Sequence, residues 1–193
     1  EYENKNGKRK HWIIASRKDY NTLKKQYFEQ TEEKTDAVII AAFHEKADAL
    51  VLIKQFRVPL NDYIYELPAG LIDAGEDLRS ALTRELKEET GLHVLEINER
   101  LGRDRTYLSA GMTEESAAII YCSCDGTVTK EYLEEDEDIE VFLVTQEKAQ
   151  ELLASNVKMD AKVFTEFSNF NAFRMNRRWL GLALFPAAMG IFG

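Results

Sequence analysis

The sequence predicts a mixed α/β (α+β) fold, in which strands and amphipathic helices share one hydrophobic core. Apolar runs of strand length occur at residues 37–43, 49–56 and 117–124. Between Asp77 and Gly91 the apolar residues recur at helical spacing instead. Because both patterns occur along one chain, we expect a sheet with packed helices.

The composition is that of a globular protein with one substantial core. The chain has 193 residues, of which 45% are hydrophobic and 31% are charged. With 25 basic and 34 acidic residues, the net charge is −9. A negative surface argues against nucleic acid or an anionic membrane as a partner, although a local basic site for phosphate is compatible with it.

The N-terminal residues differ from the rest of the chain. Residues 1–36 are polar and mixed, with a short apolar piece from Trp12 to Ile14 that fits a strand. We expect 1–36 to be an N-terminal β segment and 37–193 to be the main domain. The chain opens with EYENKNGKRK, which has no apolar signal sequence, so a cytoplasmic location is expected.

The two cysteines and the C-terminal tail carry weaker signals. Cys122 and Cys124 alternate along an expected strand, where they are poorly placed for a disulfide, so we expect reduced thiols. The tail from Trp179 to Gly193 is uncharged and interrupted by Pro186. It is short for a membrane span, and we expect it to pack on the domain or on a partner subunit.

The first strands lead directly to the stretch with the clearest chemistry. Residues 37–43 and 49–56 are separated by the polar HEKAD, which predicts a hairpin. A third strand at 63–67 should deliver Ala69 and Gly70 to the loop that follows. The remaining elements are expected as strands at 93–101, at 117–124 and from Ile139, and as helices at 145–155 and 160–180.

The second of these helices carries a regular aromatic pattern. Phe164, Phe167, Phe170 and Phe173 fall every three residues. This spacing favours a hydrophobic stripe that covers the sheet or a dimer contact over a ligand site.

The stretch 70–92, GLIDAGEDLRSALTRELKEETGL, predicts a loop, a helix and a second loop. Asp77 can cap the helix and Gly91 fits its left-handed end. Glu85, Glu88 and Glu89 then share one face. Grouped carboxylates suit a hard divalent ion such as Mg²⁺, held together with substrate phosphates. The alternative for a bare ELKEE is a solvated acidic face.

The full spacing decides between these alternatives. The residues from 70 to 92 resemble the Nudix box at each of its specified positions, which are Gly70, Glu76, Arg84, Glu85, Leu86, Glu88, Glu89, Gly91 and Leu92. The resemblance implies a mixed β-sheet sandwiched between helices. It also implies hydrolysis of a nucleoside diphosphate linked to another group, with Mg²⁺ as cofactor and Mn²⁺ as a substitute.

The same resemblance implies a role for each charged residue of the box. Glu85 and Glu89 would be the principal metal ligands, and Glu88 would assist them. Arg84 would orient a glutamate by ion pairing. Gly70 and Glu76 would support the site.

The flanking stretch QFRVPLNDYIYELPAGLIDAGED resembles the ADP-ribose pyrophosphatase branch of that family. The resemblance implies that Arg57 binds substrate phosphate and that the carbonyl of Ala69 binds a metal ion. It also implies that Trp12 stacks on the adenine and that Arg17 contacts the substrate. Without it, Arg57 would be interpreted as a surface arginine and Trp12 as a core residue.

Two departures from the branch bear on the substrate. Ile13 stands where the family often has a glutamate that binds the adenine edge. Ala110 replaces the proline of a Ser-Pro-Gly loop, which an acidic residue follows; here Glu114 and Glu115 follow, and Glu115 is the expected substrate contact. These departures make other nucleotide sugars, namely GDP-mannose, UDP-glucose or ADP-glucose, the alternative to ADP-ribose.

The acidic stretch LEEDEDIEV has two interpretations. The ordinary one is a solvated loop before a strand. In the resembling family, this loop supplies the glutamate that accepts a proton from the attacking water. The pattern aligns that role best with Glu135, and with Glu137 second.

Together these features predict hydrolysis of ADP-ribose to AMP and ribose 5-phosphate. The expected partner is a small nucleotide-sugar substrate, with neither nucleic acid nor membrane. The resemblance further implies a homodimer in which the N-terminal segments exchange. A non-catalytic ligand sensor is the alternative from a different class, but it would usually have lost the box carboxylates.

Overall fold

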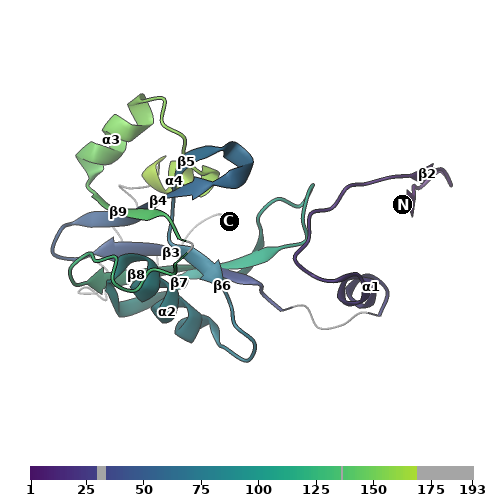
Figure 1. Ribbon diagram of the computed structural model, residues 1–193, viewed down its shortest axis with the longest axis horizontal. Coiled ribbons are helices and arrows are strands. Elements are labelled where there is room, and N and C mark those ends of the chain that lie inside the picture. Colours follow the sequence, from purple (N-terminus) through teal and green to yellow (C-terminus); the bar gives the residue numbers. More distant parts are fainter. Residues whose placement is uncertain (30–33, 136, 169–193) are drawn as a thin grey trace, which may run out of the picture.

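The computed structural model describes residues 1–29, 34–135 and 137–168 (Figure 1). It confirms the predicted mixed α/β fold. Its strands are β1 (Tyr2–Glu3), β2 (Arg9–Lys10), β3 (Ala37–His44), β4 (Ala49–Arg57), β5 (Asp62–Glu66), β6 (Ala69–Leu71), β7 (His93–Tyr107), β8 (Ser116–Asp125) and β9 (Ile139–Val144). Its helices are α1 (Tyr20–Phe28), α2 (Leu78–Thr90), α3 (Gln146–Ala154) and α4 (Ala161–Ser168), with a short 3-10 turn at Val58–Leu60.

The main sheet is mixed and has seven strands. Its central order is β5-β4-β3-β8-β7, with β6 paired to β3 and β9 paired to β4. β3 runs parallel to β8 and antiparallel to β4 and β6. The predicted hairpin is confirmed, because Phe43 of β3 pairs with Leu50 of β4.

Helices cover both faces of this sheet, which explains the continuous apolar run of β3. All eight residues of β3 are buried, and alternate ones face opposite sides. Val38, Ile40 and Ala42 share a core with α2, while Ile39 and Ala41 share one with α3 and α4. Figure 1 shows α2 on one side of the sheet and α3 and α4 on the other.

Helix α2 begins and ends as its sequence predicts. Asp77 Oδ1 accepts hydrogen bonds from the backbone N–H groups of Arg79 and Ser80, at 2.9 and 3.0 Å. Gly91 ends the helix with φ of 75°, a conformation that favours glycine. Both capping signals therefore act on the helix that carries the carboxylates.

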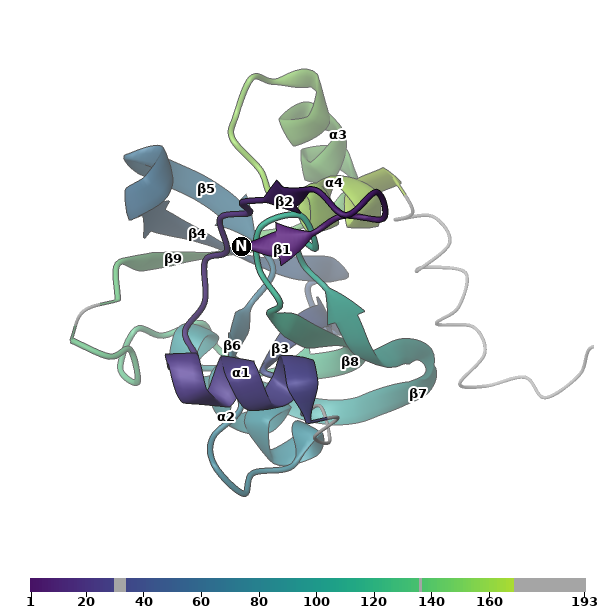
Figure 2. The ribbon, with the colours of Figure 1, turned by 90° about the vertical axis from the view of Figure 1, so that its right-hand side faces the viewer.

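The N-terminal segment differs from the expected strand. Trp12 to Ile14 has no regular secondary structure and is exposed, since it pairs with no strand of the sheet. Instead β1 and β2 pair with each other, and α1 follows at Tyr20–Phe28, a helix that the sequence analysis did not anticipate. In Figure 1 this arm stands out from the sheet and its helices, and Figure 2 shows α1, β1 and β2 in front of the domain from the side on which the arm projects.

Other expected elements differ in length or cannot be compared. β7 continues to Tyr107 rather than residue 101, because it pairs with β8 through several register shifts. The helix expected at 160–180 is present as α4 up to Ser168, and the remainder lies outside the described residues. So do Phe170, Phe173 and the tail.

The expectation for the two cysteines is confirmed, whereas the tail lies outside the described residues. Cys122 and Cys124 are free thiols buried in β8. In the described part of the chain, no helix combines the length and the apolar character needed to cross a bilayer.

The packing of α2 predicts a large cost for shortening Leu82, whose side chain is fully buried beneath the sheet. Leu82→Ala should lower the free energy of unfolding by about 2–5 kcal/mol, because it removes buried methyl groups and leaves a cavity. Urea unfolding measures the loss. Leu95→Ala, at a residue that is 50% exposed, should cost much less, and equal losses would contradict the core assignment.

Candidate active site

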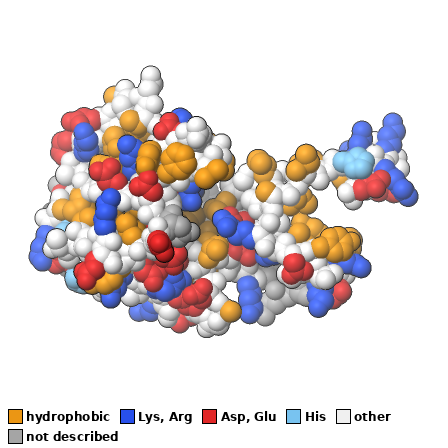
Figure 3. Space-filling view, viewed as in Figure 1, with side chains coloured by type: hydrophobic (Ala, Val, Ile, Leu, Met, Phe, Trp, Pro, Cys, Tyr) orange, Lys and Arg blue, Asp and Glu red, His pale blue; other side chains and the backbone are white. Residues whose placement is uncertain are grey.

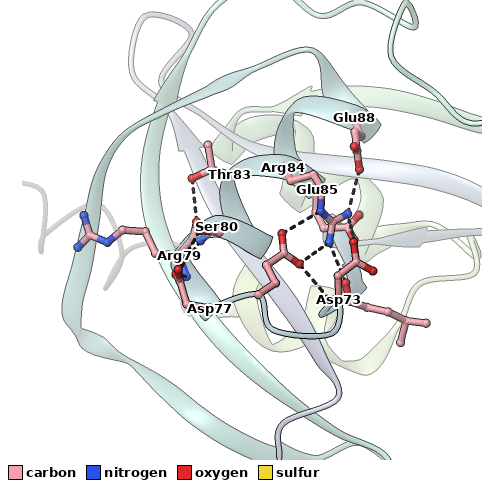
Figure 4. A network of polar contacts seen from close by, with 10 residues as sticks. Asp73, Asp77, Arg79, Ser80, Thr83, Arg84, Glu85 and Glu88 are labelled. Atoms are coloured by element: carbon pink, nitrogen blue, oxygen red, sulfur yellow. Dashed lines mark hydrogen bonds and ion pairs between the residues drawn. The ribbon is translucent and has the colours of Figure 1, made fainter.

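Arg84 is the centre of a polar network that joins α2 to the loop before it (Figure 4). Its guanidinium holds Glu76 with two bonds, from Nε at 3.0 Å and from Nη2 at 2.8 Å. Nη1 donates to Glu85 at 2.7 Å and to Glu88 at 3.0 Å, and Nη2 donates to the carbonyl of Leu71 at 2.9 Å. One cation therefore orders three carboxylates that would otherwise repel one another.

Glu76 links this network to the loop before α2. Its Oε2 accepts a hydrogen bond from the N–H of Asp73 at 3.0 Å. The Arg84 bond, followed by the Asp73 bond, lowers the pKa of the Glu76 carboxyl below its usual value. Glu76 is thus a charged support for both Arg84 and the loop.

Glu85 lies directly against Gly70. Only 9% of Glu85 is exposed, and a Cβ atom added to Gly70 would come within 1.9–2.1 Å of its carboxyl group. The box glycine is therefore required by close approach, since any larger residue would displace the carboxylate.

Glu89 is the most deeply buried member of the box. It is 2% exposed, and its Oε2 accepts a hydrogen bond from the N–H of Ala69 at 3.0 Å. Burial raises its pKa well above the usual value, and the charges of Glu85 and Glu137 raise it further. Burial likewise raises the pKa of Glu85, although Arg84 opposes the shift.

Arg57 approaches this pair from the end of β4. Its Nε donates to Glu66 Oε2 at 2.8 Å, which fixes the side chain while leaving it half exposed. Its charge acts on Glu89 and opposes part of the rise in the pKa of that carboxyl. An arginine fork next to buried carboxylates is well placed for phosphate oxygens.

The acidic loop before β9 brings Glu137 to the same place. Glu137 is among the charges that most raise the pKa values of Glu85 and Glu89, whereas Glu135 is not. Of the two loop glutamates, Glu137 is thus the one whose charge acts on the box carboxylates.

The N-terminal arm joins the loop between β7 and β8. Trp12 is 58% exposed, and its Nε1 donates to the carbonyl of Gly111 at 2.9 Å, so it is not a core residue. The N–H of Ala15 donates to the carbonyl of Met112 at 2.8 Å, and Arg17 Nε donates to Glu115 Oε1 at 2.8 Å. The arm and loop thus form one unit.

Two clefts lie along this unit. An apolar one is lined by Trp12, Ile14, Tyr27, Phe28, Tyr107 and Met112. A second cleft of about 840 Å³ runs from Arg17 and Glu115 to the box loop at Glu76. Figure 3 shows hydrophobic side chains exposed along the arm.

Comparison with known proteins places this geometry in a family. A family model described as the NUDIX domain matches residues 33–167, which is most of the chain. The chain belongs to the Nudix hydrolase family. The predicted family and fold are thereby confirmed, and the expected class of enzyme, a hydrolase that acts on pyrophosphate bonds, agrees with this family.

Three relatives illustrate the similarity. A nudix hydrolase of Caenorhabditis elegans is 35% identical over 75% of this chain and 66% of its own length. The ADP-ribose pyrophosphatase of Saccharomyces cerevisiae is 35% identical over 61% of this chain and 54% of its own length. The ADP-ribose pyrophosphatase of Bacillus subtilis is 35% identical over 58% of this chain and 60% of its own length. The chain thus spans just over half to two thirds of the length of these relatives.

The Nudix box carboxylates fit a divalent ion. In the described part of the chain, no three carboxylate, imidazole or thiol side chains already converge to enclose one. Mg²⁺ often takes only one or two carboxylates, together with water and substrate phosphates. Glu85 and Glu89 offer such oxygens, and their pKa values are raised first by burial and then by neighbouring negative charges, which a cation would offset.

Sequence reasoning missed the partners that hold the site residues. Glu66 pairs with Arg57, and the loop carbonyl of Gly111 accepts from Trp12. An acidic residue at the end of the strand that leads to Ala69 was a visible signal for the first. The backbone partner of Trp12 left no signal in the side-chain pattern.

The raised pKa of Glu89 predicts how stability depends on pH in the metal-free protein. As pH rises above 4.5, the ordinary value, the unfolded state releases the Glu89 proton while the folded state keeps it. Stability is thus lost with rising pH, whereas Glu89→Gln avoids the loss. Between pH 4.5 and the higher pKa of Glu89 in the folded state, the free energy of unfolding of the variant should therefore increase relative to the wild type by up to about 1.4 kcal/mol per pH unit.

Urea unfolding in a chelator between pH 4 and pH 8 measures the difference. Glu76→Gln is the matched control, because the pKa of Glu76 is lowered and its stabilising charge is present at high pH. The free energy of unfolding of Glu76→Gln should decrease relative to the wild type as pH rises from the acid range. The same slope for both variants would contradict the assigned environments.

Proposed function

We propose that the chain hydrolyses the diphosphate of a nucleotide sugar, with ADP-ribose as the leading substrate and AMP and ribose 5-phosphate as products. The observation that carries this proposal is the buried pair of Glu85 and Glu89, with Arg57 and Glu137 acting on it from two other segments. Relatives named ADP-ribose pyrophosphatase support the choice of substrate.

The proposed metal is Mg²⁺, with Mn²⁺ as a substitute. Glu85, Glu89, Glu88 and the carbonyl of Ala69 would hold it. When bound, it would neutralise diphosphate charge and acidify a water molecule.

The chain's own residues perform the remaining tasks. Glu137 accepts the proton of the attacking water as the new oxygen–phosphorus bond forms and the bridging oxygen leaves. Arg57 holds a phosphate oxygen while charge shifts onto it. Arg84 and Glu76 keep Glu85 and Glu88 in place, so that little reorganisation accompanies the reaction.

The arm supplies the proposed binding site for the nucleotide. Trp12 presents an exposed ring for the base, and Arg17 with Glu115 borders the cleft that reaches the box loop. We propose residues 1–36 as the segment that binds substrate and forms a homodimer, and 37–193 as the hydrolase domain. Exposed Ile13, Tyr20 and Phe28 supply apolar surface for such a dimer.

Another nucleotide sugar is the second candidate. Ile13 is 90% exposed and its side chain offers no hydrogen bond to an adenine edge, and Ala110 lines the apolar cleft. Both features loosen the preference for ADP-ribose without altering the metal chemistry. A non-catalytic sensor has less support, because the box retains all its carboxylates.

A substrate panel tests the function. ADP-ribose, ADP-glucose, GDP-mannose, UDP-glucose and a dinucleotide should be compared with Mg²⁺ and with chelator, with release of nucleoside monophosphate as readout. ADP-ribose should be preferred, and Glu85→Gln should lower kcat by about a hundredfold or more. Preference for another sugar would favour the second candidate, and no turnover of any member would refute hydrolysis of these compounds.

The assignment of the base is tested by two matched variants in one loop. Glu137→Gln should lower kcat by about 10²–10⁴, the usual contribution of a general base. Glu135→Gln should change kcat by less than about threefold, as expected for a solvated carboxylate. Steady-state kinetics at saturating Mg²⁺ measures both, and the reverse order would restore Glu135 as the base.

A further inference from the structure

The acidic loop before β9 is tied down next to the proposed base. The Tyr63 hydroxyl, on β5, donates a hydrogen bond to the Asp138 carboxylate, and the N–H of Phe56 lies 3.4 Å from the Asp138 carbonyl. β9 begins at the following residue and pairs with β4. Since Asp138 directly follows Glu137, the Tyr63 bond holds the backbone beside the base.

The other end of the loop is tied to α2. The N–H of Thr129 donates to the carbonyl of Thr90 at 3.1 Å. Lys87 Nζ lies 4.7 Å from the centroid of the Tyr132 ring, which is within the range of a cation–π interaction. Both contacts are made to the helix that carries the buried carboxylates.

Between these ends, two hydrogen bonds with backbone N–H donors join Glu134 and Glu137. The N–H of Glu134 donates to Glu137 Oε2 at 3.2 Å, and the N–H of Glu137 donates to the carbonyl of Glu134 at 3.1 Å. The Glu137 charge is close enough to act on Glu85 and Glu89.

The acidic loop lies close to other negative charges, so electrostatic repulsion opposes this arrangement. The loop is acidic, and the face of α2 that it approaches carries Glu85, Glu88 and Glu89. Like charges at short range repel, so a loop without tethers would move away and take Glu137 with it. Tyr63 and the Lys87–Tyr132 contact oppose that repulsion.

We propose that Tyr63 and Tyr132 are positioning residues for the hydrolysis, which hold the loop so that Glu137 stays within reach of the attacking water. The inference rests on the proposed function. In this proposal each tyrosine acts through Glu137 and not on the substrate itself. Lys87 is the partner through which Tyr132 acts.

The kinetic test removes one contact at a time from the full chain. Tyr63→Phe should lower kcat by roughly tenfold or more with little change in KM, because small displacements of a catalytic group are costly. Tyr132→Ala should have a smaller effect of the same kind. Tyr132→Phe should restore most of the rate, since the cation–π contact needs only the ring.

Tyr121→Phe is the matched control. Tyr121 donates to Glu166 Oε1 at 2.7 Å, which is also a bond from a tyrosine to a carboxylate, but it joins β8 to α4 and packs against the core shared with α3 and α4. This variant should lose stability and keep its kcat. A loss of kcat equal to that of Tyr63→Phe would reduce Tyr63 to a structural residue and overturn the inference.

A second background separates positioning from general destabilisation. If Tyr63 acts through Glu137, Tyr63→Phe should have no further effect on kcat once Glu137→Gln is present. An equal loss in both backgrounds would overturn the inference. A role that is only structural predicts that equal loss, because its effect would not depend on the side chain at position 137.

Hydrogen exchange tests the tether without turnover. Amide exchange in peptides from residues 129–138 should be faster in Tyr63→Phe than in the wild type or Tyr121→Phe. Unchanged exchange would overturn the inference whatever the activity. A wild type that hydrolyses none of the substrates would refute the proposed function and the positioning role together, and exchange would still show whether Tyr63 holds the loop.

Discussion

The burial of two neighbouring carboxylates, Glu85 and Glu89, is the constraint on which the site depends. A carboxylate moved out of water loses hydration, and two such groups also repel each other. Arg84 and the N–H of Ala69 offset part of this cost. The remainder appears as raised pKa values, which make the pair a ready ligand for a divalent cation. The strained electrostatics and the proposed chemistry thus have one cause.

The sheet makes this burial possible by its mixed topology. β6 adds to β3 just before α2 begins, which lays the glycine and alanine backbone of that strand against the carboxylates of the helix. β4 extends past β3 to carry Arg57, and β9 on its other edge receives the acidic loop. β6, the end of β4 and the loop before β9 are far apart in the chain, but sheet pairing brings all three to the carboxylates of α2.

The N-terminal arm differs from the domain that it joins, because its apolar side chains are exposed and not packed in a core. Its aromatic and aliphatic side chains are exposed, and it contacts the domain mainly through polar bonds to the loop between β7 and β8. Apolar surface held out in this way suits a ligand or a second chain better than a core. The domain would then supply the chemistry and the arm the recognition.

Much of the site could be predicted from the sequence alone. The box spacing, the Asp77 cap and the Gly91 end define α2 locally, because capping and periodicity involve residues a few positions apart. For the same reason the strands at 37–43 and 49–56 were predicted in their observed pairing. What these local signals determine is which residue types lie on which face of an element.

Only the tertiary structure decided which distant groups meet. The acidic loop has no periodicity, and its alignment with the family favoured Glu135 over Glu137, whereas in the structure it is the charge of Glu137 that raises the pKa values of Glu85 and Glu89. Trp12 has the character of a core residue, yet no strand partner receives it and it stays exposed. The tether of Asp138 to Tyr63 depends on β5 and β9 both flanking β4, an arrangement set by sheet pairing and not by neighbouring residues.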